Sequence, residues 1–162
     1  MSIHVVSASV DDPGMVDLLT THLATMHAVT PAGFVFALDL DGLRGDGVRL
    51  FALRDGDELI GCGAIARIDE YHGELKSMHV RAARRGQGLA GRLLTALEAD
   101  ARTRGVTRLS LETGDNDEFA AAHALYERHG YEPCPPFGSY TDNGHSAFFS
   151  KRLGGPLDRR PA

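Results

Sequence analysis

The sequence predicts a domain that mixes α-helices with β-strands and contains at least one antiparallel hairpin. Two strand-like segments, 48–53 and 58–68, flank the turn Arg54-Asp55-Gly56-Asp57, and an Asp-Gly pair between such segments is typical of a hairpin. A strand at 73–80, a glycine-rich loop and a helix at about 88–104 then follow one another. With 43% hydrophobic and 24% charged residues among 162, the chain has the composition of one soluble globular domain.

The segment before the hairpin predicts one strand and one helix. Residues 3–8 have the pattern of a first strand. Asp11-Asp12-Pro13 is typical of a helix start, with an acidic cap and a proline in the first turn. The helix continues to about Met26, because apolar residues recur at helical spacing, and Thr30-Pro31-Ala32-Gly33 ends it. Residues 34–43 are ambiguous and are compatible with a short second helix.

The second half of the chain predicts two amphipathic helices that alternate with strands. The apolar stripe of the 88–104 helix is Leu89, Leu93, Leu94, Leu97 and Ala101, and Gly105 suits its C-terminal cap. We expect a strand at 108–112, a helix at 118–129 and short strands near Tyr131 and at 146–152. One domain therefore spans residues 1–153, and residues 154–162 form a flexible tail.

Composition and charge exclude several classes of function. The net charge of -5 argues against nucleic acid as a partner, because phosphate binding needs a basic face. The start of the chain lacks a signal-peptide pattern, and no apolar run is long enough for a membrane span, so we expect no membrane partner. Cys62 and Cys134 lie far apart, which is typical of reduced thiols in a cytoplasmic protein. The eight histidines form no HExxH motif or tight ligand cluster, so we expect no metal.

The stretch Arg84-Arg85-Gly86-Gln87-Gly88-Leu89-Ala90-Gly91 admits two nucleotide-binding interpretations. Gly86, Gly88 and Gly91 form G-x-G-x-x-G, and Glu112 follows at the distance of the acidic residue in a dinucleotide site. However, five residues separate the preceding strand from Gly86, and a hairpin precedes the unit. The alternative is a loop that holds the pyrophosphate of coenzyme A on the free N–H groups at the start of the helix. The sequence favours this second interpretation.

Three stretches carry a family resemblance: GELKSMHV at 73–80, RRGQGLAGRLL at 84–94 and ALYERHGYEP at 124–133. In this order and spacing they resemble the GNAT superfamily of acetyl-coenzyme A-dependent N-acetyltransferases, and LSLETG and PPFGSY look like a bacterial subgroup. The resemblance implies an α/β (α+β) fold, with a mixed central sheet of about six to seven strands and helices on both faces. Its two central parallel strands, here 73–80 and 108–112, splay apart to admit the cofactor.

The resemblance also implies acetyl-CoA as cosubstrate and a direct transfer of its acetyl group to a primary amine of a small-molecule or amino-acid-like acceptor. The backbone of the strand would contact the pantetheine arm, and the loop would hold the pyrophosphate. The implied cofactor-binding residues are Met78, His79, Val80, Arg85, Gly86, Gln87, Gly88, Leu89, Ala90, Gly91 and Tyr126.

The resemblance implies that Tyr126 protonates the departing thiolate, which suits the chemistry of a phenol. Glu74 matches the position of a glutamate base, Glu112 is its rival, and His79 is a weaker candidate. One position departs from the family pattern: Phe119 stands where many members have a cofactor-contacting asparagine. Asn116 lies nearby as a possible substitute.

Acceptor selection is expected to fall to residues 23–40 and 135–145. The candidate acceptor-binding residues are His22, Met26, His27, Glu112, Phe137 and Tyr140. Two other functions stay open at this point: a noncatalytic acyl-CoA-binding sensor, and a nucleotide-dependent oxidoreductase. The chain is also compatible with a homodimer, which is common in this superfamily.

Overall fold

Seven strands form one mixed sheet in the order β1-β2-β3-β4-β5-β7-β6 in the computed structural model, which describes residues 2–35 and 39–154. Only β4 and β5 pair in parallel, and all other neighbours are antiparallel. The strands are β1 (Ile3–Ala8), β2 (Val48–Asp55), β3 (Glu58–Arg67), β4 (His72–Val80), β5 (Arg108–Gly114), β6 (Glu132–Pro133) and β7 (Ser146–Arg152). The helices are α1 (Met15–Val29), α2 (Leu40–Leu43), α3 (Leu89–Thr103) and α4 (Ala120–Arg128), with short 3-10 turns η1 (Ala82–Arg84) and η2 (Asp117–Phe119).

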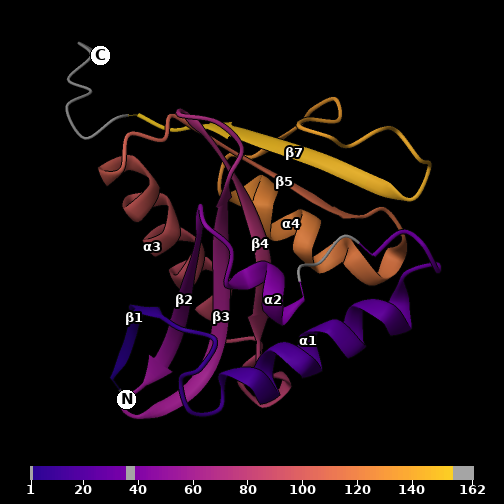
Figure 1. Cartoon of the computed structure of the whole chain (residues 1–162). Coiled ribbons are helices and arrows are strands. Elements are labelled where there is room, and N and C mark those ends of the chain that lie inside the picture. Colours follow the sequence, from indigo (N-terminus) through magenta and orange to yellow (C-terminus); the bar gives the residue numbers. More distant parts are fainter. Residues whose placement is uncertain (1, 36–38, 155–162) are drawn as a thin grey trace.

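The predicted fold class is confirmed: the sheet is mixed, and helices cover both of its faces. Neighbouring residues of β2 belong to two different hydrophobic cores. Phe51 and Leu53 pack with the leucines of α3, whereas Leu50 and Ala52 pack with α1. Because side chains of a strand alternate between faces, α1 and α3 must lie on opposite sides of the sheet, as Figure 1 shows.

The start of α1 differs from the prediction. The helix begins at Met15 after Gly14, which has a left-handed backbone with φ 82° and provides no side-chain cap. The Asp12 carboxylate instead accepts the N–H of Ser9 at 2.9 Å and closes a turn before the helix. Asp12 therefore stabilises the turn that leads from β1 into α1, whereas the Asp11 carboxylate pairs with Arg44 at 2.7 Å, and the helix runs on to Val29.

Two further segments are less helical than predicted. Of residues 34–43, only Leu40–Leu43 forms a helix, capped where Asp39 accepts the N–H of Gly42 at 2.8 Å, while 36–38 lie outside the described residues. The helix expected at 118–129 starts with the 3-10 turn η2, because the side chain of Asn116 accepts the N–H of Glu118 and fixes a tighter first turn. Of the predicted tail at 154–162, residues 155–162 also lie outside the described residues.

The feature of the fold that creates a site is the early end of pairing between β4 and β5. The two strands pair at His72↔Arg108, Gly73↔Leu109 and Glu74↔Ser110, and then separate. Beyond Glu74, the register of β4 with β3 also shifts, and Ser77 adopts a left-handed backbone with φ 56°. Figure 1 shows the two halves of the sheet diverging from this point.

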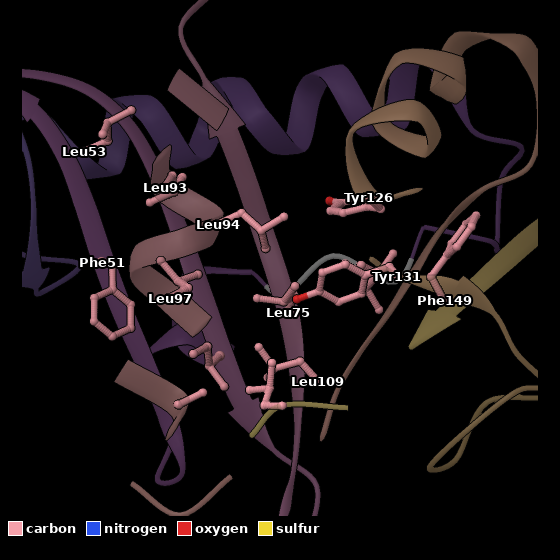
Figure 2. Close-up of a cluster of buried hydrophobic side chains, with 14 of the residues drawn as sticks. Phe51, Leu53, Leu75, Leu93, Leu94, Leu97, Leu109, Tyr126, Tyr131 and Phe149 are labelled. Carbon is pink, nitrogen blue, oxygen red and sulfur yellow. The ribbon is translucent and has the colours of Figure 1, made fainter. Parts of the chain in front are cut away.

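Aromatic side chains and one buried ion pair hold the diverging half in place. Figure 2 shows leucines of α3 packed over the sheet, with Tyr126, Tyr131 and Phe149 at the other end of the same cluster. The buried Glu98 of α3 accepts a hydrogen bond from Tyr131 Oη at 2.8 Å and pairs with Lys151 Nζ of β7 at 3.0 Å. These contacts connect α3 to the outer strands across the split.

Candidate active site

A cavity of about 440 Å³ lies between the end of β4, the glycine loop and α4. We call it the loop cavity. Most of the predicted cofactor-binding residues line it, whereas Gln87 is exposed and does not. The lining residues taken from that prediction are Met78, His79, Val80, Arg85, Gly86, Gly88, Leu89, Ala90, Gly91 and Tyr126.

The loop cavity contains the backbone geometry of an anion site. Gly88 caps α3 with a left-handed backbone of φ 73° and no side-chain hydrogen bond, so the first N–H groups of α3 are uncapped by side chains. Gly86 is also left-handed, with φ 79°, and a Cβ at Gly86 or Gly88 would meet no atom within 4 Å. Open space in front of uncapped N–H groups at a helix start suits a diphosphate.

The two arginines of the loop have different environments. The Arg84 guanidinium pairs with Asp55 at 2.8 Å and with Glu58 at 3.3 Å, which fastens the loop to the β2–β3 hairpin. Arg85 is exposed and lines the cavity, and its Nε donates to the carbonyl of Val80 at 3.1 Å. Both arginines line the loop cavity, but the Arg84 guanidinium is paired with two carboxylates, whereas that of Arg85 pairs with no carboxylate among the described residues.

A second cavity, of about 140 Å³, lies between α1, α4 and the split between β4 and β5. We call it the carboxylate cavity, because Glu74 and Glu112 both line it. Predicted residues His22 and Met26 of α1 also line it, whereas His27 is exposed and lies outside it. Its apolar wall includes Leu111, Phe119, Ala122 and Phe34.

Glu74 is held by one oxygen. Its Oε2 accepts the hydroxyl of Tyr140 at 2.5 Å and an N–H of Lys76 at 3.1 Å, and Lys76 Nζ also donates to the Tyr140 hydroxyl at 3.0 Å. The Glu74 side chain is 12% exposed, and its Oε1 accepts no hydrogen bond from the described residues. One oxygen is therefore anchored, and the other remains available to a ligand.

Glu112 lies across the split on β5. Burial raises the pKa of its carboxyl group, an effect partly offset by the hydrogen bond from Ser146 Oγ at 2.6 Å and by the charge of Lys76. The negative charge of Glu74 raises this pKa further. Glu74, Lys76 and Glu112 thus form one charged group on the α1 side of the sheet.

Tyr126 lies where the two cavities meet. Met78, Ala122 and Tyr126 line both cavities, so the α4 tyrosine stands at their junction. Tyr126 is 8% exposed, and none of the described residues forms a hydrogen bond with its hydroxyl. Burial raises the pKa of this phenol to about 12, which keeps it protonated at neutral pH.

The loop at 135–145 forms a third, outer pocket beside the carboxylate cavity. Phe137 and Tyr140, both predicted as acceptor-binding residues, line it together with Glu74 and Lys76. The rings of Phe137 and Tyr140 meet edge to face with centroids 5.2 Å apart. The structure therefore brings this loop to the same carboxylate as α1.

His22 and His79 form a buried pair beneath the carboxylate cavity. Their Nδ1 atoms lie 3.2 Å apart, so one ring must donate and the other accept. Burial lowers the pKa of each to about 4, and for His79 the charge of His22 lowers it further. Both rings are therefore neutral at pH 7, and the side chain of His79 packs against α1.

Phe119, the departure from the family pattern, fills space beside Gly114. A Cβ at Gly114 would come within 2.2 Å of the Phe119 ring, so the ring occupies the place where a side chain would stand. Asn116, the possible substitute, uses its side chain elsewhere: its Nδ2 donates to the carbonyl of Val29 at 2.9 Å and its Oδ1 caps η2. It connects α1 to η2.

Sequence reasoning missed Lys76, Ser146 and the pairing of His22 with His79. For Lys76 a signal was present, because Glu74 and Lys76 are two residues apart in a strand and must share one face. The contact between Ser146 and Glu112 joins residues 34 positions apart, and the histidine pair joins residues 57 positions apart. No local sequence pattern indicates contacts over such separations.

Two possibilities find no support within residues 2–35 and 39–154. No three His, Cys, Asp or Glu side chains in these ranges gather in a way that could hold a metal ion. No helix there is long and apolar enough to cross a membrane.

Comparisons with known proteins agree on one family. Residues 17–131 match the model of the acetyltransferase (GNAT) family. The uncharacterized N-acetyltransferase YsnE of Bacillus subtilis is 40% identical over 139 residues, which cover 86% of this chain and 92% of YsnE. A solved structure from Klebsiella pneumoniae, classed with the acyl-CoA N-acyltransferases, matches with a TM-score of 0.76 at 32% identity. The match covers 93% of this chain and 97% of the Klebsiella chain. A GNAT acetyltransferase from Elizabethkingia anophelis with acetyl-CoA bound shares the fold, with a TM-score of 0.67 at 16% identity, over 94% of this chain and 99% of its own.

The buried histidine pair predicts a pH-dependent stability. Because the folded pKa of each ring lies below its usual 6.5, the unfolded chain binds more protons between about pH 6.5 and pH 4. The free energy of unfolding should fall as pH drops through this window, by an amount on the order of 2–4 kcal/mol. Urea unfolding at a series of pH values measures it. His22→Leu should flatten the dependence, and His27→Leu, on the exposed face of the same helix, should not; equal slopes in both variants would contradict the assignment.

Proposed function

The chain belongs to the GNAT acetyltransferase family and is an acyltransferase, and we propose that it transfers the acetyl group of acetyl-CoA directly to the primary amine of a small acceptor. The observation that carries this proposal is the meeting of two different cavities at Tyr126. One has an anion site made of backbone N–H groups, and the other has two carboxylates.

The fit of the cofactor is supported by a strand edge without a strand partner as well as by the loop; of its groups, the Val80 carbonyl accepts a hydrogen bond from Arg85 Nε. Beyond Glu74, the edge of β4 that faces β5 has no strand partner, while the opposite edge still pairs with β3 at His79 and Val80. Backbone N–H and C=O groups at such a site need partners, and the amides of a pantetheine arm can supply them. We therefore propose that Met78, His79 and Val80 bind the arm and that residues 85–91 bind the pyrophosphate.

Acetyl-CoA supplies a reactive acetyl thioester, and the protein must supply a neutral amine beside it. An alkylammonium with a pKa near 10.4 is only about 0.04% neutral at pH 7, so a base that takes its proton removes a cost of roughly 4–5 kcal/mol. Glu74 is our candidate, because its anchored Oε2 fixes the carboxylate while Oε1 stays available. Glu112 lies in the same cavity and is the rival.

Tyr126 completes the proton balance. The ammonium first gives one proton to the carboxylate, which passes it to solvent. As the C–N bond forms and the C–S bond breaks, the nitrogen loses its second proton to the same carboxylate, and the sulfur gains one from the phenol. The phenolate then recovers a proton from solvent, so one proton is released per turnover. The Tyr126 hydroxyl is protonated and bonded to none of the described residues, so it is free to act as this general acid. No covalent bond to the protein is required.

The assay that tests the function is thiol release from acetyl-CoA in the presence of a panel of primary amines. We expect release that depends on the acceptor. In Tyr126→Phe, kcat should fall about 100-fold, while the Kd for acetyl-CoA should change less than about threefold. The wild-type rate should show no loss from phenol ionisation between pH 7 and pH 10, since the Tyr126 pKa is about 12. Tyr71→Phe, at an exposed site, is the matched control. Tight binding of acetyl-CoA without release for any amine would favour a sensor instead.

Replacing each carboxylate separately identifies the base. In Glu74→Gln, the amine must lose its proton before it binds, so we expect kcat/KM at pH 7 to be about 10²–10⁴-fold below that of the wild type. As pH increases toward the pKa of the amine, kcat/KM of this variant should rise about tenfold per pH unit. Glu112→Gln should keep the shape of the wild-type profile. The opposite result, with the steep profile in Glu112→Gln alone, would transfer the role of base to Glu112.

A further inference from the structure

We propose that the acceptor is a zwitterion, an apolar amino acid whose carboxylate binds Lys76 while its amine faces Glu74 and Glu112. This assignment rests on the proposed acetyl transfer and narrows its substrate class. It follows from the charged group of the carboxylate cavity, in which one nearly buried lysine stands between two carboxylates.

Lys76 has one donor more than the protein uses. Its ammonium carries three N–H groups, and among the described residues it donates to Glu74 Oε2 and to the hydroxyl of Tyr140. Its side chain is only 10% exposed and lines both the carboxylate cavity and the outer pocket. A buried ammonium is stable when its donors are satisfied, so the remaining N–H suits an acceptor oxygen from a ligand.

The charges of the cavity complement a zwitterion better than a simple amine. Glu74 and Glu112 each offer an oxygen, Oε1, that accepts no hydrogen bond from the described residues, and these oxygens suit the ammonium of the acceptor. An amine without an acid group would satisfy these oxygens and leave the Lys76 donor unpaired. An amino acid satisfies both kinds of group at once. His22, the other titratable group that faces the cavity from α1, is neutral at pH 7 and adds no charge.

The remaining walls indicate the side chain of the acceptor. Met26, Phe34 and Phe119 line the same cavity as the charged group, and its volume is about 140 Å³. Such a cavity suits a small or medium apolar side chain. The outer pocket shares Glu74 and Lys76 with this cavity.

A simpler role for Lys76 is to hold Glu74 in place. The two roles predict different results, because a lysine that only anchors the base affects every acceptor alike. A lysine that binds the acceptor carboxylate affects only acceptors that carry one. The effect of one Lys76 variant on an acceptor with this group, compared with its effect on an acceptor without it, therefore separates the two roles.

The experiment measures thiol release with leucine, leucinamide and 3-methylbutylamine, and with the matching series for valine and alanine. In the wild type we expect kcat/KM for an amino acid to exceed kcat/KM for its decarboxylated amine by at least about tenfold. Lys76→Met should lower kcat/KM for the amino acid about 10–100-fold, mainly by raising KM. The same variant should change kcat/KM for the decarboxylated amine less than about threefold. Lys76→Arg keeps the cation and should retain the preference for the amino acid.

The control is Arg104→Met, which removes an exposed cation just past the end of α3 that lines none of the three pockets. It should leave the preference unchanged. Melting temperature and the Kd for acetyl-CoA show whether each variant is folded, and Lys76→Gln replaces Lys76→Met if the latter does not fold. Equal loss for both acceptors in the variant, or a wild type that prefers the amines, would overturn the carboxylate assignment while leaving acetyl transfer intact. Absence of release from every acceptor would overturn acetyl transfer and this assignment with it.

Discussion

The end of pairing between β4 and β5 after Glu74 and Ser110 is the constraint on which the rest of the structure depends. A continuous sheet would satisfy the backbone of β4 along both edges and would leave no room beside Tyr126. Because pairing stops, one edge of β4 carries unpaired backbone groups, and a space opens between the halves of the sheet. The left-handed backbone at Ser77 lies in this stretch, and its buried Oγ has no hydrogen-bond partner among the described residues. Strain and an unpaired group of this kind cluster at functional sites.

The split would be costly without contacts that hold the two halves apart. The α4 helix supplies Tyr126 to the main core, and Tyr131 and Phe149 pack beside it, as Figure 2 shows. The buried group of Glu98, Tyr131 and Lys151 then connects α3 to β7 with three satisfied polar partners. A buried charge is tolerated when it is paired and hydrogen-bonded, and this network therefore fixes the outer strands at an angle that keeps the site open.

Strand alternation explains how one sheet serves both stability and chemistry. Leu75, Leu109 and Leu111 point to the α3 side and belong to the main core. Their neighbours in sequence, Glu74 and Glu112, point to the α1 side, where α1 covers mainly the β2–β3 half. The polar residues therefore gather on the part of the sheet that α1 leaves open. The strands were predictable from this alternation and the glycine loop from the spacing of its glycines, whereas the fold class followed from the family resemblance. The start of α1 was not predictable, since Asp12 binds Ser9 rather than the helix, and the contacts of Lys76 with Tyr140 and of His22 with His79 join distant segments.

The central claim, that the gap between β4 and β5 receives the arm of an acyl carrier, is tested most directly by a crystal structure of the protein with coenzyme A. We predict the pyrophosphate on the N–H groups of residues 86–91, the pantetheine amides paired with the free edge of β4 at 78–80, and the thiol beside the Tyr126 hydroxyl. A structure in which coenzyme A binds elsewhere, or in which β4 and β5 stay paired beyond Glu74, would contradict the account.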